Sequence, residues 1–510
     1  MTEVFPAPPR TAAGGDDTGS RSLGRLLSAL GVVVVVVAFV LLVPELRHWM
    51  VVPVAACGAL VAPDLYDWAS GELDVLDPQA VIALVGTHFF VLAPLLHVTL
   101  DAWPRYLEPV TDWRQALGTM AALNFAGLLL YRGVLALRGR PRRTAVTRLD
   151  HTRFQALGWV VVLTSLITFV TLVFGFGGPG NYVATLTSLD KDLTGYGPMF
   201  LAAACFPLVV FVLVLLRART VLRRRPFLLL VLVIAFTLVQ FVVAGLHGSR
   251  SSVVWPVLIA IGACHLLITP VRRRTLVVAL IVIGGFMYLY GFYKSAGADA
   301  VDVFTGGRSV DELSEQTGRD VPLLLLGDLA RADIQALTLD RELTRPDLTG
   351  GGITYLGDLL FLVARDVRPD LPDKVAIGTE LLYGPGAYES GTRSSQIYGL
   401  AGEATLNFGP IGAVLSFVPL ALVVRVARSR YRSALLPDAP VDRRLLASVL
   451  PIIVVLVLTA DLDNLLWFTV NDVAVLACLV LLSRRKEVPT SPPTAGVTTK
   501  GAKPQGLRCA

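Results

Sequence analysis

The stretch "FLLLVLVIAFTLVQFVVAGL", residues 227–246, decides the fold class. Its twenty residues carry no charge, and only Thr237 and Gln240 have polar side chains. An apolar helix of about 20 residues is long enough to cross the hydrocarbon core of a bilayer, which is about 30 Å thick. The stretch therefore predicts a membrane-spanning helix.

Similar runs recur along the whole chain. Of its 510 residues, 54% are hydrophobic, and the mean hydropathy is +0.64, which excludes an ordinary soluble globular protein. The pattern predicts an all-α polytopic membrane protein embedded in a lipid bilayer. The twelve predicted spans lie near 25–43, 49–63, 80–100, 115–137, 154–175, 198–216, 227–246, 252–269, 275–293, 398–424, 445–460 and 466–483.

Basic residues gather in the short connections between these runs. The clusters are "RGRPRR" (138–143), "RARTVLRRR" (217–225), "RRR" (272–274), "RVARSRYR" (425–432), "DRR" (442–444) and "SRRK" (483–486). With twelve spans, all of them and both termini fall on one side, which the positive-inside rule makes cytoplasmic. The net charge of +6 therefore indicates membrane topology rather than nucleic-acid binding. The same count places the acidic connection 64–78 inside.

The chain then divides into five parts. We expect a disordered cytoplasmic N-terminus at 1–24, nine spans over 25–293, a large extracytoplasmic loop at 294–397, three spans over 398–483, and a disordered cytoplasmic tail at 484–510. Within the loop, 320–343 and 353–367 have apolar residues at helical spacing. They predict amphipathic helices packed on the outer face of the membrane.

The sequence favours neither a cofactor nor a metal site. Four cysteines lie in predicted spans and one lies in the tail, without the spacing of a zinc site or a disulfide framework. No P-loop, no G-x-G-x-x-G after a strand and no H-E-x-x-H motif occurs. We therefore expect no metal, no cofactor and no ATP-driven step.

Two outer segments share the pattern G-x-R-S-S. One is "GSRSS" (248–252), with Arg250 and with His247 just before it; the other is "GTRSS" (391–395), with Arg393. A guanidinium among hydroxyl and amide donors suits a diphosphate. The alternative reading of Arg250 is a snorkelling interfacial arginine. Arg393, like the other basic residues of the loop, also fits a solvated surface with salt bridges.

A third element, "GEATLNFGPIG" (402–412), places Glu403 and Asn407 on one helical face. Gly409-Pro410 then predicts a kink. The pair is either a water-exposed cap at a helix start or a polar group facing a cavity in the bundle. Further along, Asp461 and Asp463 read as loop residues, whereas Asp472 lies within the last span.

The order of these elements resembles a known family. Many spans, an outer G-x-R turn, "RPDLPDKVAIG" (368–378) and then "GEATLNFGPIGA" (402–413) are similar to the Wzy-type O-antigen polymerases, the oligosaccharide repeat-unit polymerases, which are related to the O-antigen ligases. In that family a P-x-x-P-x-K-P element precedes a G-E-x-x-x-N-F-G-x-x-G element. Here Val375 stands where a proline is common.

The resemblance implies a metal-independent, GT-C-like membrane glycosyltransferase. It would polymerise polyprenyl-diphosphate-linked oligosaccharide repeat units into a surface polysaccharide at the outer face of the cytoplasmic membrane. A chain-length regulator and a flippase would be candidate partners. By motif, Arg250 matches the outer arginine, Lys374 the loop lysine, and Glu403 and Asn407 the G-E and N-F-G positions. The ligase branch has a loop histidine, and none occurs in 294–397.

These observations give roles to the candidate residues. Fixed arginines stabilise the charge of a departing diphosphate: Arg250 and Arg393 come first, with Arg365 or Arg368 as the alternative. Glu403 is the first candidate for a general base and Asp366 the second. His247, Lys374 and Asn407 complete the substrate-binding set. The rival functions are a glycan ligase, another polyprenyl-linked sugar transferase, and a transporter or flippase, although no internal repeat supports the transporter.

Overall fold

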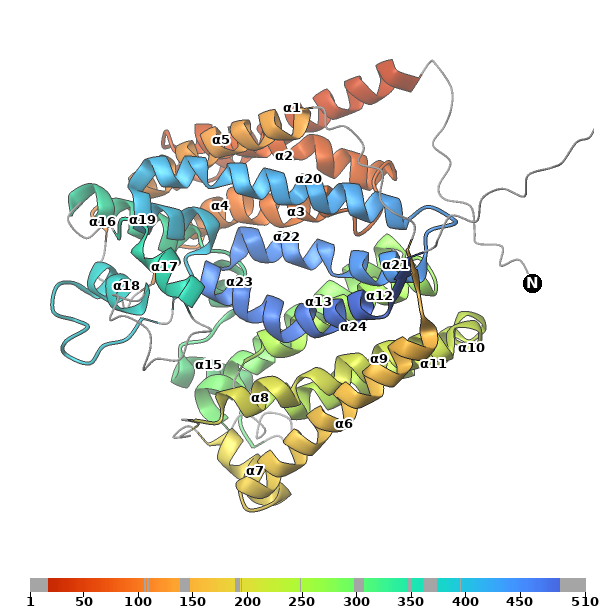
Figure 1. The fold of residues 1–510 in the computed structure, drawn as a ribbon. Helices are drawn as coiled ribbons and strands as arrows, with labels where there is room; N and C mark the ends of the chain where they lie inside the picture. The colour runs from red at the N-terminus through yellow and green to blue at the C-terminus, as the bar shows by residue number, and fades with distance from the viewer. Residues whose placement is uncertain are drawn as a thin grey trace, which may run out of the picture.

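The computed structural model describes residues 17–104, 107, 110–137, 147–188, 193, 195–247, 249–297, 307–345, 350–360, 374–394 and 396–486. Within these residues the chain is almost entirely helical (Figure 1). Eight helices or helix runs are long and apolar enough to cross a membrane. An all-α polytopic membrane protein is therefore confirmed.

Helices of the first half alternate with short turns. They are α1 (Asp17–Leu42), α2 (Val51–Ser70), α3 (Pro78–Thr87), α4 (Ala93–Thr99), α5 (Trp113–Ala136), α6 (His151–Gly175), α7 (Pro179–Thr187), α8 (Gly197–Ala203), α9 (Cys205–Arg217), α10 (Arg219–Arg224), α11 (Pro226–Gln240), α12 (Ser251–Leu267) and α13 (Arg273–Ala296). The turn η1 (Pro44–Leu46) is 3-10 helical, while η2 (His88–Leu92) and η3 (Phe241–Gly245) are π-helical.

Short helices of the long loop come next, followed by the last spans. They are α15 (Val310–Thr317), the π-helical η5 (Leu323–Asp328), α16 (Ala332–Thr344), α17 (Ile353–Leu359), α18 (Lys374–Tyr383), α19 (Gly399–Leu415), α20 (Phe417–Ala434), α21 (Val441–Ser448), α22 (Leu450–Thr459), α23 (Leu462–Phe468), the π-helical η8 (Thr469–Ala474) and α24 (Val475–Leu482). Two strands, β1 (Thr147–Leu149) and β2 (Arg484–Lys486), pair antiparallel.

The twelve-span count stays a prediction. The eight qualifying helices match eight of the predicted runs, and the bent pair α19–α20 would make a ninth. The helix α12 is apolar but has only 17 residues. The remaining predicted runs, 49–63 and 445–460, fall on α2 and on α21–α22, which are not among the qualifying helices.

Two apolar cores hold the helices together. One is formed by buried side chains of α2 to α5, α16, α19 and α20. The other is formed by α6, α9, α11, α12 and α24. Buried residues of α22 belong to both cores, and Figure 1 shows this helix between the two groups. The two halves are thus joined along α22.

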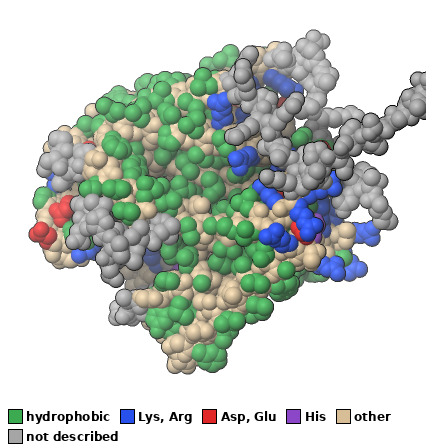
Figure 2. Space-filling view, viewed as in Figure 1, with side chains coloured by type: hydrophobic (Ala, Val, Ile, Leu, Met, Phe, Trp, Pro, Cys, Tyr) green, Lys and Arg blue, Asp and Glu red, His purple; other side chains and the backbone are tan. Residues whose placement is uncertain are grey.

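The two ends of the bundle differ in charge. Helices α15 to α18 lie at one end, and α10, α21 and the strand pair lie at the other (Figure 1). Figure 2 shows hydrophobic side chains over the middle of this face and most Lys and Arg at the α10–α21 end. The basic connections within the described residues therefore share one end, as predicted, and the described part of 294–397 lies at the opposite end; the cluster 138–143 lies outside the described residues.

The acidic connection 64–78 lies at the basic end, where the sequence places it. Its carboxylates pair with arginines of other helices: Asp67 Oδ2 lies 2.7 Å from Arg25 Nη2, and Asp77 Oδ1 lies 3.4 Å from Arg428 Nε. The acidic residues thus neutralise part of the basic end and do not argue against its orientation.

The helix α16 differs from the expected surface helix. Its buried residues include Ile334, Leu337 and Leu339 together with Gln335 and Thr338, so most of its circumference is covered. It contacts α5 and α19. Because neighbouring helices surround it, α16 is part of the core and is not laid on a membrane surface.

The predicted disordered ends also differ from the structure. The helix α1 begins at Asp17, so residues 17–24 extend the first span. Residues 484–486 pair with β1, and Arg484 Nε lies 2.7 Å from Asp442 Oδ2. Backbone pairing and this buried carboxylate order the start of the predicted tail.

Candidate functional site

A buried carboxylate starts helix α19, which carries the G-E-x-x-x-N-F-G element. Asp461, between α22 and α23, accepts hydrogen bonds at Oδ1 from Tyr398 N at 2.8 Å and Gly399 N at 2.7 Å. A carboxylate at a helix N-terminus satisfies free N–H groups and complements the helix dipole. A residue more than 60 positions downstream thereby fixes the start of α19.

Lys374 neutralises this carboxylate. Its Nζ lies 2.8 Å from Asp461 Oδ2 and 2.6 Å from Asp463 Oδ1, and its side chain is 7% exposed. Burial alone would lower the pKa of Lys374, but the two carboxylates outweigh it and raise the pKa above the usual value. Lys374 therefore acts as a buried counter-ion that ties α18 to the α22–α23 turn, which differs from its predicted role as a substrate contact.

Glu403 is buried on the first turns of α19. Its Oε2 accepts a hydrogen bond from Leu462 N at 2.8 Å, which pins it to the start of α23. Its Oε1 and Asp358 Oδ2 are both buried and receive no bond from an N–H or O–H donor of the described residues. The two carboxyl groups lie within hydrogen-bonding range of each other. Two ionised carboxylates this close would repel each other, so one proton is shared between them. Glu403 and Asp358 thus form a carboxyl pair.

The pair is poised for proton transfer near neutral pH. Burial raises the pKa of Asp358 to about 6. A carboxyl group with a pKa near the working pH can both accept and release a proton efficiently. The arrangement also excludes the exposed-cap interpretation of Glu403, because the side chain is buried.

Asn407 supports the same face of α19. Its Nδ2 donates to Thr354 Oγ1 at 2.6 Å and to the Glu403 backbone oxygen at 2.9 Å. Gly350 N donates to Leu406 O at 2.9 Å, which docks the segment before α17 onto α19. Asn407 therefore holds α17, and with it Asp358, against Glu403.

A second cluster surrounds Asp328 at the end of η5. Arg250 forms a bidentate ion pair with Asp328, and Arg319 Nη1 lies 3.1 Å from Asp328 Oδ2. Burial alone would raise the pKa of Asp328, but the two guanidinium groups hold it below the usual value. Lys294 lies within electrostatic range of all three. Three basic groups face one carboxylate, which leaves an excess of positive charge.

Arg331 lies within electrostatic range of two buried carboxylates, Asp461 and Asp328. Its guanidinium bonds to the backbone oxygens of Gly327 and Ala330. Burial lowers the pKa of Arg331, while the nearby charges of Asp461 and Asp328 oppose that shift. The charges of Asp461 and Asp328 therefore both act on the buried Arg331.

The other predicted residues lie apart from the carboxyl pair or outside the described ranges. Arg393 is exposed; its Nη1 donates to Thr392 O at 2.7 Å, and its guanidinium lies 3.7 Å from the Tyr388 ring centre. His247 packs against Phe200 with the rings tilted by 56° and their centres 5.0 Å apart. The predictions for Arg365, Asp366 and Arg368 fall outside the described residues.

Sequence reasoning missed four members of these clusters: Asp328, Asp358, Arg319 and Lys294. Asp328 and Asp358 each follow the letters "LG" inside an apolar stretch, "LLLLGDL" (323–329) and "TYLGDLL" (354–360). A carboxylate interrupting an apolar face was the available signal. Arg319 gave none, because it stands in a polar segment. Among the described residues, no group of three or more His, Cys, Asp or Glu has the arrangement of a metal site.

Comparison with known proteins adds no family. No protein-family model, no curated protein and no solved structure matches the chain.

Proposed function

We propose that this chain is a membrane glycosyltransferase that joins polyprenyl-diphosphate-linked oligosaccharide repeat units at the outer face of the cytoplasmic membrane. The observation that carries the proposal is that the buried Glu403–Asp358 pair and the cationic cluster around Asp328 lie at the same end of the bundle, opposite the described basic connections. Anion stabilisation and proton transfer are the two tasks of glycosyl transfer from a diphosphate.

The cationic cluster supplies the anion site. When the bond between the anomeric carbon and the phosphate oxygen breaks, its electron pair stays on the departing diphosphate. Arg250, Arg319 and Lys294 would stabilise that charge, and Asp328 holds the guanidinium groups in place before the substrate arrives. A preorganised cationic site stabilises developing charge without reorganising during the reaction.

The carboxyl pair supplies the base. The acceptor hydroxyl attacks the anomeric carbon and gives its proton to the pair, in which Asp358, with a pKa of about 6, is ionised near pH 7. Glu403 is anchored by Leu462 N and positions its partner. Removing a general base lowers a reaction rate by about 10²–10⁴-fold.

Deletion of the gene tests the proposal in cells. We expect lipid-linked single repeat units to accumulate and long polysaccharide chains to disappear. A plasmid with the wild-type gene should restore the chains, and one with Glu403→Gln should not. The matched control is Glu389→Gln, an exposed carboxylate of the same loop, which should restore them. Unchanged glycans in the deletion strain would refute the proposal.

A transporter is the second candidate, because of one structural feature. Helices α19 and α20 are bent by 59° at their junction, and discontinuous helices are common at transporter binding sites. A transporter would move lipid-linked units across the membrane of vesicles that contain the purified protein, without joining the units. The same vesicles report both outcomes.

A further inference from the structure

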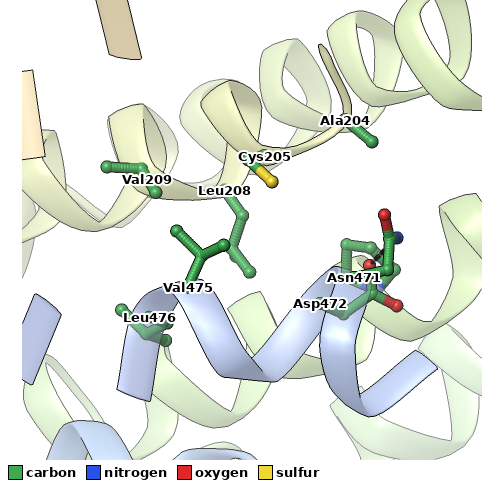
Figure 3. A pocket seen from close by; sticks show the side chains of 9 residues that line it. Ala204, Cys205, Leu208, Val209, Asn471, Asp472, Val475 and Leu476 are labelled. Carbon is green, nitrogen blue, oxygen red and sulfur yellow. Dashed lines mark hydrogen bonds between the residues drawn. The ribbon is translucent and has the colours of Figure 1, made fainter. Parts of the chain in front are cut away.

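Two adjoining cavities lie among α8, α9, α12 and the helix run from α23 to α24. The larger, about 190 Å³, touches the Arg250 turn through His247 and Ser252 and touches the last helix run through Trp467 and Asn471. The smaller, about 10 Å³, is lined by Asp472. Asn471 borders both. Figure 3 shows Asn471 and Asp472 of η8 across from Cys205 and Leu208 of α9.

The inner end of this space has an unsatisfied polar group. Asn471 Nδ2 donates to Asp472 Oδ1 at 2.5 Å. Asp472 is 6% exposed, and its Oδ2 has no partner among the described residues. A buried oxygen without a donor is unfavourable, and native proteins rarely leave one. A ligand hydroxyl would supply the missing donor.

Part of the wall of the larger cavity is formed by the aromatic rings of Phe200 and Trp467. Trp467 precedes Asn471 by four residues, so the two lie on one face of the helix. The Trp467 side chain keeps 39% of its surface exposed although it borders the cavity. An indole face packs against the apolar C–H face of a sugar ring, while amide and carboxyl groups bond the hydroxyls at its rim. The cavity volume of about 190 Å³ is many times the roughly 10–15 Å³ that a single water needs, so the cavity has room for a ligand ring.

We propose that the larger cavity is a subsite for one sugar ring of the glycan, with Trp467 as the stacking platform, and that one ring hydroxyl enters the adjoining smaller cavity, where Asn471 and Asp472 bind it. The inference rests on the proposed function. It also fits the layout, because α23 starts at the bond between Leu462 and Glu403, and Trp467 follows about 7–8 Å further along the helix axis. An isoprenoid chain, lacking hydroxyls, would leave Asp472 unsatisfied.

Binding to the full-length protein in detergent tests the subsite. The probe is the oligosaccharide released by mild acid from the producing strain's lipid-linked intermediates, carrying a fluorescent label. We expect Trp467→Ala to weaken binding about tenfold, the loss of about 1.4 kcal/mol, and Trp467→Phe to restore most of it. The control Trp159→Ala, an exposed position on α6, should bind as wild type.

The lipid-linked form of the same oligosaccharide separates the sugar from the lipid. Weaker binding of both forms by Trp467→Ala and by Asp472→Ala supports a sugar subsite. Weakening of the lipid-linked form alone would assign the cavity to the isoprenoid and overturn the inference. Unchanged binding by both variants, or no binding of the free oligosaccharide to wild type, would also overturn it.

Failure of the subsite and failure of the proposed function give different results. Glu403→Gln should bind the probe as wild type does while forming no polymer. If the subsite is wrong but the function is right, Trp467→Ala polymerises with an unchanged KM. If the function is wrong, wild type forms no polymer, whatever Trp467 does to binding.

Discussion

At the level of single residues, the proposed chemistry depends on buried carboxyl groups. Asp358 and Glu403 are so close that ionisation of one disfavours ionisation of the other. The buried charge of Asp461 is stabilised by Lys374 and by two backbone N–H groups. The sequence could not predict these pairings, because the partners lie 45 to 87 residues apart in the chain. The sequence left Glu403 as either an exposed cap or a group inside the bundle, and its burial favours the second reading.

The raised pKa of Asp358 makes stability depend on pH. In the folded protein the group binds its proton more tightly than in the unfolded chain, so stability falls as pH rises from about 4 to about 6 and stays lowered above that. We expect Asp358→Asn to match wild type at pH 4.5 and to unfold at a higher temperature at pH 7.5. Tryptophan fluorescence during heating in detergent measures both. An equal loss of stability at both pH values would contradict the assignment.

Lys374 is expected to matter more for folding than for substrate contact. Lys374→Met leaves the fully buried Asp461 without its counter-ion, and removing one partner of a buried ion pair costs about 3–5 kcal/mol. Asp461→Asn should cost less, because the amide oxygen still accepts from Tyr398 N and Gly399 N. Thermal unfolding of the two single variants and the double variant measures the coupling. Additive effects would show that the pair does not interact.

At the scale of elements, α19 links the loop to the bundle. The sequence predicted its kink at Gly409-Pro410, and Gly409 has φ 61° and ψ −154°. Only glycine adopts that region readily. The further bend of 59° comes at the junction with α20 and was not predicted, because Ser416 gives no breaking signal. Local chemistry thus identified the non-helical residue inside α19.

Gly409→Ala should therefore destabilise the protein by about 1–3 kcal/mol and lower polymer formation. A methyl group at Gly409 would meet no atom within 4 Å, so the backbone angle alone is responsible. Gly284→Ala on α13 is the matched control. Gly284 has the same open space around it, but, unlike Gly409, it lies inside a regular helix, so its replacement should be neutral or slightly stabilising. Chemical denaturation in detergent compares them. Equal stability of the two variants would show that Gly409 is not strained by a side chain.

At the scale of the whole molecule, hydropathy and charge predicted most of the architecture. Eight of the twelve predicted spans match long apolar helices, and the basic connections among the described residues share one end. The burial of α16 could not be predicted, because an amphipathic pattern does not say whether a second surface covers the polar face. The docking of loop segments onto α19 depends on such long-range contacts.

The orientation is open to a direct test. We expect Ser390→Cys, at the exposed tip of the α18–α19 connection, to react with a membrane-impermeant maleimide in intact cells. Ser433→Cys, at the end of α20 near the basic connections, should react only after the membrane is opened. Both variants are made in a chain with its native cysteines replaced by serine or alanine. The reverse pattern of labelling would place the carboxyl pair on the cytoplasmic side.

Reconstitution of the purified protein with purified lipid-linked repeat units tests the central claim most directly. Mass spectrometry of the lipid-linked products counts the repeat units on each polyprenyl diphosphate. We predict that wild type forms dimers and longer chains and releases one polyprenyl diphosphate for every bond made, whereas Glu403→Gln leaves the single units unchanged. Single units that wild type also leaves unjoined, in vesicles where the protein is folded, would contradict the account.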